Sequence, residues 1–247
     1  MTLFQLKSFC TDAGTFVLDM LFPLRCLGCD AKNVWICTAC LHGIPIHTEQ
    51  RCPTCLHRIT PFGQTCFDCR DATSPMLDGL FAASPYHDSL LPYAIHTFKY
   101  RFIPGLSAPL GDFLTEVVQR SALPLPDLII PVPLHRRRLR FRGFNQSELL
   151  ARELSQSLTP GLEIPLMSDI LLRIRHTKPQ MKTESREERL ANLKNAFAMA
   201  EGKKETIRGK YIWLVDDVAT TGTTLEECAA VLKKHGARSV FGVVLAR

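Results

Sequence analysis

Residues 212–232 restrict the architecture of this chain more than any other segment. They begin with the short apolar run Ile212–Val215, which is typical of a strand buried inside a parallel sheet. Two adjacent carboxylates follow, then a small loop rich in threonine, and then apolar residues at helical spacing. The order of strand, acidic pair, loop and helix predicts an α/β fold with a ligand beyond the carboxyl ends of its strands. The expected helix buries Leu225, Cys228, Ala229 and Leu232 and ends before Gly236.

The loop after the acidic pair has the composition of a phosphate site. Its backbone N–H groups and hydroxyls would lie at a helix N-terminus, where the helix dipole favours an anion, and Gly222 permits a positive φ. Asp216 and Asp217 suit sugar hydroxyls, or a Mg²⁺ ion that bridges oxygens. A capped surface turn with solvated acids is the alternative, but the whole string favours a site for a ribose 5-phosphate. The residues expected to hold the phosphate are Val218, Ala219, Thr220, Thr221, Gly222, Thr223 and Thr224.

This string resembles the signature that binds phosphoribosyl pyrophosphate (PRPP) in type I phosphoribosyltransferases. In that family the paired acids hold the ribose hydroxyls, and the threonine-glycine loop holds the 5-phosphate. The resemblance implies that Asp216 and Asp217 are the catalytic acids and that residues 218–224 bind the phosphate. It also implies that Mg²⁺ accompanies PRPP.

Eight of the ten cysteines form four Cys-x-x-Cys pairs. Eight thiolates suffice for two tetrahedral zinc sites, and because little apolar sequence lies between the pairs, the metal would supply the folding energy. Disulfides and redox dithiols are the alternatives; the first need an oxidising compartment, and the second are usually single motifs. Sequential and interleaved pairings both fit the spacing. The expected ligands are Cys26, Cys29, Cys37, Cys40, Cys52, Cys55, Cys66 and Cys69.

The segment before the cysteines, Met1–Pro23, carries apolar residues at helical spacing and is expected to be an amphipathic helix. Lys7, Asp12 and Asp19 interrupt its apolar residues, and no small-residue cleavage site follows. We therefore expect neither a secretory signal nor insertion into a membrane.

The polar linker Asp71–Pro75 predicts a boundary between an N-terminal domain, residues 1–75, and a larger domain, residues 76–247. A chain of 247 residues with 46% hydrophobic residues is long enough for two such domains. Beyond the linker, apolar runs predict alternating strands and helices. The expected strands are residues 80–83, 127–132, 170–174, 210–217 and 239–246, and the expected helices begin near residues 87, 106, 146, 185 and 225.

The net charge of +6 is not evenly spread along the chain, because five arginines lie within residues 136–142. They follow the expected strand 127–132, in a basic loop that should open on the same sheet edge as the acidic pair. Phe141 and Phe144 interleave with them, which favours contact with pyrophosphate or nucleic acid over a solvated face. The arginines are Arg136, Arg137, Arg138, Arg140 and Arg142.

Two further polar segments are candidates for anion contacts. Lys99–Arg101 ends an expected helix, where we expect a cap of the helix dipole in preference to an anion contact. Residues 175–180 carry no periodicity and are expected to form a mobile loop over the site, with Lys178 as a further candidate for pyrophosphate or DNA.

Nearly the whole chain from Pro23 onward resembles the ComF family, and its GntX-like members most of all. The resemblance implies a double zinc ribbon joined to a phosphoribosyltransferase-like domain with a doubly wound, mostly parallel sheet. It also implies a role in the uptake and use of extracellular DNA in the cytoplasm, with incoming single-stranded DNA and a DNA-uptake or helicase-type protein as partners. The resemblance rests on the cysteine pairs, Arg142–Ala151, Arg175, Thr177, Gln180, Arg189, Asn192, Phe197 and the terminal signature.

Pro131 and Pro133 depart from the transferase pattern. The family resemblance implies that backbone amides after the first core strand hold pyrophosphate, but proline has no N–H to donate. Arginine side chains would substitute, since a guanidinium binds phosphate through two hydrogen bonds. No nucleobase pocket is recognisable, so PRPP binding is better supported than base transfer. An active PRPP-dependent transferase of nucleobase or nucleotide salvage and a PRPP-sensing regulator are the alternatives.

Overall fold

The computed structural model describes residues 24–87, 89–175 and 195–247. The chain divides into two compact units, of which the first ends at Ile44 and the second runs from Pro45 to Arg247. The helices predicted in residues 1–23 and after residue 185, and the loop that carries Lys178, lie outside the described residues. No helix among the described residues has the length and apolar character needed to cross a membrane.

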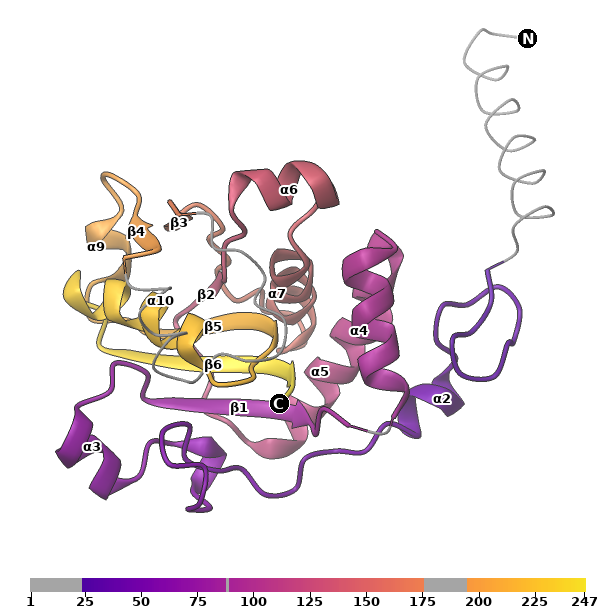
Figure 1. Cartoon of the computed structure of the whole chain (residues 1–247), viewed down its shortest axis with the longest axis horizontal. Coiled ribbons are helices and arrows are strands. Elements are labelled where there is room, and N and C mark those ends of the chain that lie inside the picture. The colour runs from indigo at the N-terminus through magenta and orange to yellow at the C-terminus, as the bar shows by residue number, and fades with distance from the viewer. Residues whose placement is uncertain (1–23, 88, 176–194) are drawn as a thin grey trace, which may run out of the picture. The chain divides into compact units, whose positions relative to one another are not determined.

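Four parallel strands form the main sheet of the second unit (Figure 1). They are β1 (Gly79–Ser84), β2 (Leu128–Pro131), β5 (Tyr211–Val218) and β6 (Ser239–Ala246). Their order is β1-β6-β5-β2, so the two strands with the longest apolar runs lie in the middle. Because both faces are covered, the strands are buried almost throughout and show no alternation of polar and apolar residues.

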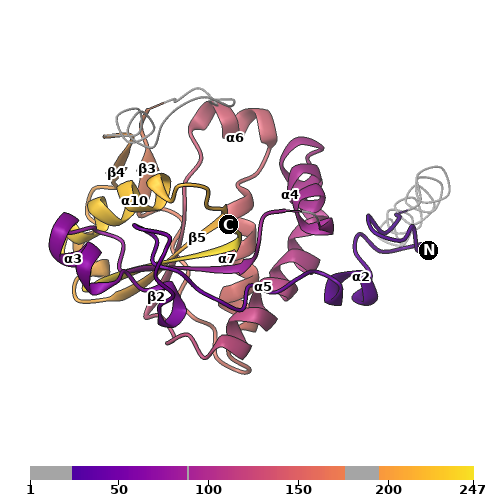
Figure 2. The same cartoon turned by 60° about the horizontal axis from the view of Figure 1, so that its bottom comes forward.

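Helices cover both faces of this sheet (Figure 2). They are α4 (Leu90–Tyr100), α5 (Ser107–Ser121), α7 (Gln146–Ser157) and α10 (Thr223–Lys234). One face packs against α10, whose Leu225 and Leu232 join Leu80 and Leu214 in the core. The other face packs against α5 and α7, with α4 beside α5. The sheet is therefore doubly wound, which confirms the predicted fold class.

The bounds of β5 and α10 show where the predicted motif of strand, acidic pair, loop and helix lies in the fold. β5 continues to Val218, so the acidic pair lies within the last residues of the strand, which agrees with the predicted strand 210–217. α10 ends in a Schellman motif, because the N–H of Gly236 donates to Lys233 O at 3.0 Å and the N–H of Ala237 donates to Leu232 O at 3.1 Å. Gly236 has a φ of +101°, so the predicted helix end is confirmed.

The predicted basic loop is wrong, because residues 136–142 form the helix α6 (Arg136–Arg142). The imidazole Nδ1 of His135 accepts a hydrogen bond from the N–H of Arg137 at 3.2 Å, and Gly143, at a φ of +83°, ends the helix. α6 buries none of its residues, so it has no apolar face that periodicity could detect.

A separate hairpin-like pair, β3 (Leu171–Arg173) and β4 (Phe197–Met199), is antiparallel and packs beside α10. The strand predicted at residues 170–174 is present, but it belongs to this pair and not to the main sheet. The remaining short helices are α2 (Thr38–His42), η1 (Pro61–Gly63), α3 (Phe67–Thr73), η2 (Pro104–Leu106) and α9 (Lys204–Ile207).

The second half of the cysteine-rich segment packs on the edge strand β1. The side chain of Gln50 bonds to both the C=O and the N–H of Ala82, at 2.9 and 3.1 Å. Gln64 forms a bridge with Gly79, and the hydroxyl of Thr65 donates to Leu77 O at 2.8 Å. These bonds make the second group of cysteines part of the same unit as the main sheet.

Candidate PRPP and zinc sites

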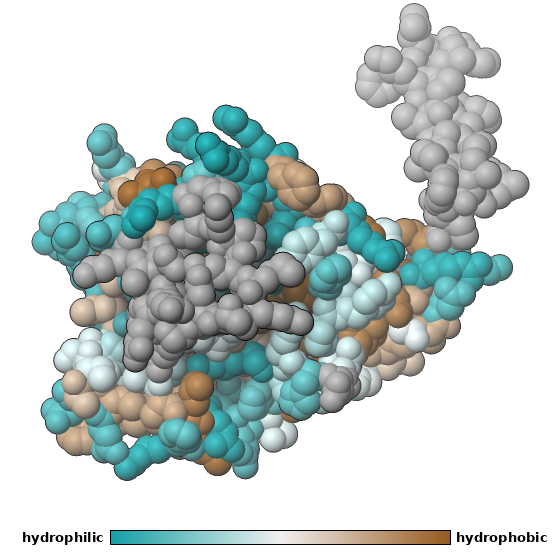
Figure 3. Space-filling model, in the orientation of Figure 1, coloured by the Kyte–Doolittle hydropathy of each residue, from teal (hydrophilic) through white to brown (hydrophobic). Residues whose placement is uncertain are grey.

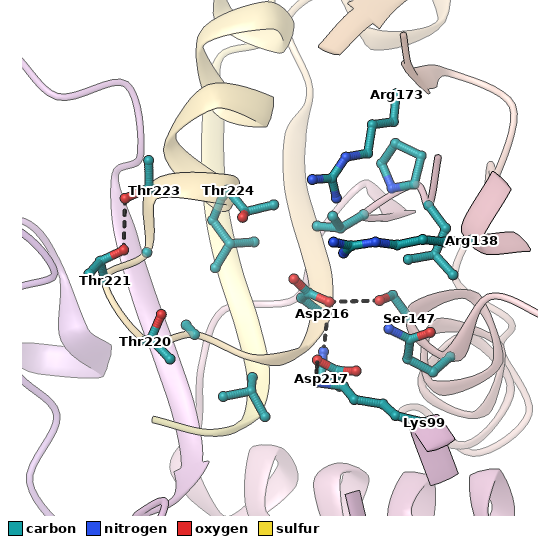
Figure 4. Close-up of a pocket in the computed structure, with 18 of the residues that line it drawn as sticks. Lys99, Arg138, Ser147, Arg173, Asp216, Asp217, Thr220, Thr221, Thr223 and Thr224 are labelled. Carbon is teal, nitrogen blue, oxygen red and sulfur yellow. Dashed lines mark hydrogen bonds and ion pairs between the residues drawn. The ribbon is translucent and has the colours of Figure 1, made fainter. Parts of the chain in front are cut away.

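A cavity of about 380 Å³ lies at the carboxyl edge of the main sheet (Figure 4). Its walls come from the end of β5, the loop before α10, the start of α7, the end of α4, α6 and β3. Four cationic and two anionic side chains line it. They are Lys99, Arg138, Arg142, Arg173, Asp216 and Asp217.

The acidic pair forms the floor of the cavity. Asp216 Oδ1 accepts a hydrogen bond from Ser147 Oγ at 2.7 Å and another from the N–H of Asp217 at 2.9 Å. Lys99 Nζ lies 2.8 Å from Asp217 Oδ1, and the two side chains are 21% and 4% exposed. The predicted role of Lys99 as a dipole cap is therefore replaced by a buried ion pair with Asp217.

Burial shifts the ionisation of these groups. Burial, together with the neighbouring Asp217 charge, raises the pKa of Asp216 to about 7, although the Ser147 hydrogen bond opposes the shift. Burial disfavours the Lys99 ammonium, but the Asp217 carboxylate outweighs this effect and raises the pKa of Lys99. The ammonium form of Lys99 is therefore favoured beside Asp217.

The threonine loop faces the cavity from the side of α10. Gly222 has a φ of +75°, a conformation that favours glycine, and it directly precedes α10. Thr221 Oγ1 and Thr223 Oγ1 lie 2.7 Å apart. Within residues 24–87, 89–175 and 195–247, no acceptor is bonded to the N–H groups of residues 220–224. These amides and hydroxyls lie together at a helix N-terminus, an arrangement that suits an anion, and we call them the anion cradle.

Two of the five predicted arginines line the cavity. Arg138 and Arg142 are half-buried and reach it from α6, and Arg173, which the sequence analysis did not select, reaches it from β3. Figure 4 shows Arg138 and Arg173 across the cavity from the threonine loop. Arg142 bonds to Gln146 Oε1 and lies over the ring of Tyr100 at 5.8 Å. The cavity thus has an anion cradle at one end and guanidinium groups at the other.

The other three predicted arginines point away. Arg136, Arg137 and Arg140 are exposed on α6 and do not line the cavity. Residues 131–133 offer no amide to a ligand, since Pro131 and Pro133 lack an N–H and the N–H of Val132 donates to Val215 O at 2.9 Å. Guanidinium groups are the donors at this end of the cavity.

Sequence analysis missed the residues that α4 and α7 contribute. Asn145 caps α7 by accepting from the N–H of Ser147 at 3.2 Å, and its amide donates to Val132 O at 3.1 Å. This holds Ser147 against Asp216. Ser147 lies in Arg142–Ala151, which carries the family resemblance, and two residues after the cap residue Asn145, but neither signal assigned it a role, and Lys99 gave none beyond its position at a helix end.

The eight predicted zinc ligands form two clusters, which resolves the pairing as sequential. In each cluster the sulfur atoms lie within 4.8 Å of one another. Cys29 Sγ and Cys37 Sγ are 3.6 Å apart, and Cys55 Sγ and Cys66 Sγ are 3.9 Å apart, close to the separation of about 3.8 Å that a tetrahedron of 2.3 Å Zn–S bonds requires. The clusters are Cys26, Cys29, Cys37 and Cys40, and Cys52, Cys55, Cys66 and Cys69.

Backbone donors stabilise the thiolate form of one buried cysteine in each cluster. The N–H of Cys37 donates to Cys26 Sγ at 3.3 Å, and the N–H of Cys66 donates to Cys52 Sγ at 3.4 Å. Burial opposes ionisation of Cys26 and Cys52, but backbone N–H donors outweigh it and lower the pKa of each to about 6. Both clusters fit structural zinc.

Comparison with known proteins gives matches across most of the chain. The phosphoribosyl transferase domain family matches residues 145–247, and the double zinc ribbon domain family matches residues 17–74. Competence protein F of Haemophilus influenzae is 33% identical over 235 residues, which cover 92% of this chain and 98% of that protein. DNA utilization protein YhgH of Salmonella typhi is 34% identical over 214 residues, which cover 85% of this chain and 82% of that protein. Competence protein ComFC of Bacillus subtilis is 28% identical over 222 residues, which cover 86% of this chain and 84% of that protein.

Proposed function

This chain belongs to the ComF family of competence and DNA utilization proteins, and on that premise we propose that it binds PRPP, or a related ribose 5-phosphate compound, in the cavity described above. One observation carries the proposal: the anion cradle of residues 220–224, the acidic pair and three guanidinium groups line the same cavity. This order matches the 5-phosphate, the ribose hydroxyls and the pyrophosphate of PRPP.

The donor set also fits a divalent ion bound with PRPP. Asp217 Oδ2 is buried and has no hydrogen-bond partner among the described residues. Carboxylate and phosphate oxygens are the ligands that Mg²⁺ prefers, and Asp216 and Asp217 would hold the ion together with the ligand's pyrophosphate. When bound, Mg²⁺ would neutralise pyrophosphate charge. The protein's own part is to orient the ribose through the acids and to neutralise phosphate through the arginines.

Arg138 and Arg140 give a matched test of this site. Both lie on α6, but only Arg138 lines the cavity. We expect Arg138→Ala to weaken PRPP binding by about tenfold or more, because one charge-assisted hydrogen bond is lost, and Arg140→Ala to leave it unchanged. Calorimetric titration with PRPP and Mg²⁺ measures both. Equal losses would assign the effect to the overall charge of α6 and would remove the support for a pyrophosphate site.

We also propose that the protein handles incoming single-stranded DNA in the cytoplasm during uptake or use of extracellular DNA. A surface beside the cavity supports this, and we call it the arginine-aromatic strip. Phe141 is 77% exposed and Tyr100 is 56% exposed, and the rings of Phe141 and Phe102 meet edge to face at 5.2 Å. The strip consists of Tyr100, Arg101, Phe102, Arg136, Arg137, Arg140 and Phe141.

The strip has the chemistry of a single-strand surface. Its four arginines are exposed, and their side chains form no ion pair or hydrogen bond with any described residue. Figure 3 shows hydrophilic and apolar surface side by side over α6, at the top of the view. Exposed aromatic rings stack on unpaired bases, and arginines neutralise the phosphates between them. A duplex hides its base faces and would gain only the charge contacts.

Phe141 and Phe67 give a matched pair for the DNA proposal, because they are 77% and 79% exposed and only Phe141 lies in the strip. We expect Phe141→Ala to weaken oligothymidylate binding by about 5- to 100-fold, the value of one stacked base, and Phe67→Ala to leave it unchanged. Fluorescence anisotropy measures both. If Phe141→Ala weakened binding to a duplex of the same length equally, base stacking would be contradicted, and the alternative of a PRPP-sensing regulator would be favoured.

The salt dependence separates the charge contribution from stacking. Replacing Arg136, Arg137 and Arg140 by alanine should lower the slope of log affinity against log salt by about 2, since each phosphate contact on a single strand contributes about 0.7. PRPP binding should be unaffected, because none of the three lines the cavity.

A DNA-uptake or helicase-type protein would be a partner at this surface.

A further inference from the structure

Lys99 is the one cationic side chain of the cavity that contacts the acidic pair within the described residues. It comes from the last turn of α4, and its Nζ lies 2.8 Å from Asp217 Oδ1. Figure 4 shows its ammonium group beside Asp217, on the side of the pair away from Arg138 and Arg173. Lys99 is therefore placed to act on the ribose end of the cavity and not on the pyrophosphate end.

The four carboxylate oxygens of the pair have different environments. Asp216 Oδ1 already accepts from Ser147 and from the N–H of Asp217, and Asp217 Oδ1 is bonded to the Lys99 ammonium. Asp217 Oδ2 is buried without a partner. Asp216 Oδ2 is left, and no described residue donates to it. A hydrated divalent ion that entered this site would meet Asp216 Oδ2, the buried Asp217 Oδ2 and a neighbouring ammonium that already neutralises one of the two charges.

We propose that Lys99 is the resident cation of the acidic pair, a positioning residue that holds Asp217 for the sugar hydroxyls and makes ribose binding largely independent of Mg²⁺. This inference rests on the proposed function of the same cavity. The ammonium neutralises one carboxylate charge before any ligand arrives, and it fixes the orientation of a carboxylate whose second oxygen is buried and has no hydrogen-bond partner among the described residues. Mg²⁺ then serves the pyrophosphate of PRPP and not the ribose.

Ribose 5-phosphate is the probe that separates the two roles, because it lacks the pyrophosphate that itself binds Mg²⁺. Calorimetric titrations of the full, zinc-loaded chain would be made with Mg²⁺ and with a chelator that spares zinc. For the wild type we expect affinities within about threefold of each other in the two buffers. Lys99→Met should lose about tenfold or more without Mg²⁺ and regain part of that loss when Mg²⁺ is added, because a cation can then enter beside Asp217.

Lys99→Arg tests whether the charge or the fold is responsible. It keeps the cation and should retain the wild-type independence from Mg²⁺, whereas Lys99→Met should lose it. If the ion pair were merely structural, Lys99→Met would have a lower melting temperature while its metal response stayed that of the wild type. Lys203→Met, in an ion pair 2.6 Å from Asp169 and outside the cavity, is the matched control.

The outcomes distinguish this inference from the function on which it rests. Wild-type binding of ribose 5-phosphate that needs Mg²⁺, or a Lys99→Met variant with an unchanged metal response, would overturn the role of Lys99 and leave the PRPP site intact. A wild type that binds neither ribose 5-phosphate nor PRPP would overturn both. A Lys99→Met variant that does not fold leaves the wild-type comparison and Lys99→Arg to decide.

Discussion

Folding raises the pKa of Asp216, and this makes the stability of the protein depend on pH. Its pKa is raised by burial and by Asp217 to about 7, from an ordinary value of 3.8. Between these two values the folded chain holds a proton that the unfolded chain has released, so this group lowers stability as pH rises from about 4 to about 7 and has no further effect above that. We expect Asp216→Asn to flatten the stability profile in this window, as measured by urea denaturation at each pH. Parallel profiles for the two proteins would contradict the assignment.

Gly222 and Gly202 share a φ of +75°, but only Gly222 belongs to the anion cradle. An added Cβ meets nothing closer than 4.0 Å at Gly222 and nothing within 4 Å at Gly202. Alanine at either position should therefore cost about 1 kcal/mol of stability for its backbone alone. We expect only Gly222→Ala to weaken binding of inorganic phosphate or ribose 5-phosphate as well. Equal binding by the two variants would mean that the cradle does not depend on this turn.

At the scale of elements, α10 joins the sheet to the segment that follows the second cysteine cluster. The Glu226 carboxylate accepts from the N–H groups of Met76 and Leu77 at 2.6 and 3.1 Å. We expect Glu226→Ala to lower the free energy of unfolding by about 2 kcal/mol, because two backbone donors lose a charged acceptor. Glu205→Ala, which removes an exposed pair with Arg208, should change it by less than about 1 kcal/mol. Chemical denaturation compares the two.

Elements with an apolar signal could be predicted from the sequence, and elements without one could not. β5 and α10 carry buried runs at clear periods, so their type and their order in the chain were predicted correctly, and the phosphate site between them stays a prediction. α6 buries no residue and is held by its end residues, so the sequence looked like a basic loop. Strand β3 has three residues, too few to show to which sheet it belongs.

The cavity itself is assembled at the scale of the whole molecule. Its acids and threonines are contiguous in the chain and were predicted, but Lys99, Ser147 and Arg173 come from three other elements. Each carries a side chain that is ordinary at a helix end or in a short strand. Only the packing of α4, α7 and β3 around the sheet edge brings these groups to Asp216 and Asp217, and periodicity contains no information on that packing.

The two cysteine clusters belong to different compact units, so their loss should have different effects. Cys55→Ser breaks the cluster whose segment bonds to β1, and we expect it to lower the stability of the unit with the cavity by about 4 kcal/mol or more. Cys29→Ser should release one zinc and leave PRPP binding and the main melting transition unchanged. Metal analysis and calorimetry check both, and identical effects would contradict the division.

The central claim is that the acidic pair and the threonine loop form a PRPP site. Its most direct test is a calorimetric titration of the zinc-replete protein with PRPP and Mg²⁺, on the wild type and on Asp216→Asn/Asp217→Asn. We expect saturable binding at one site, weakened by about 100-fold or more in the double variant, because two charged acceptors for ribose hydroxyls are lost. No PRPP binding by the folded wild type, or equal binding by the variant, would contradict the claim.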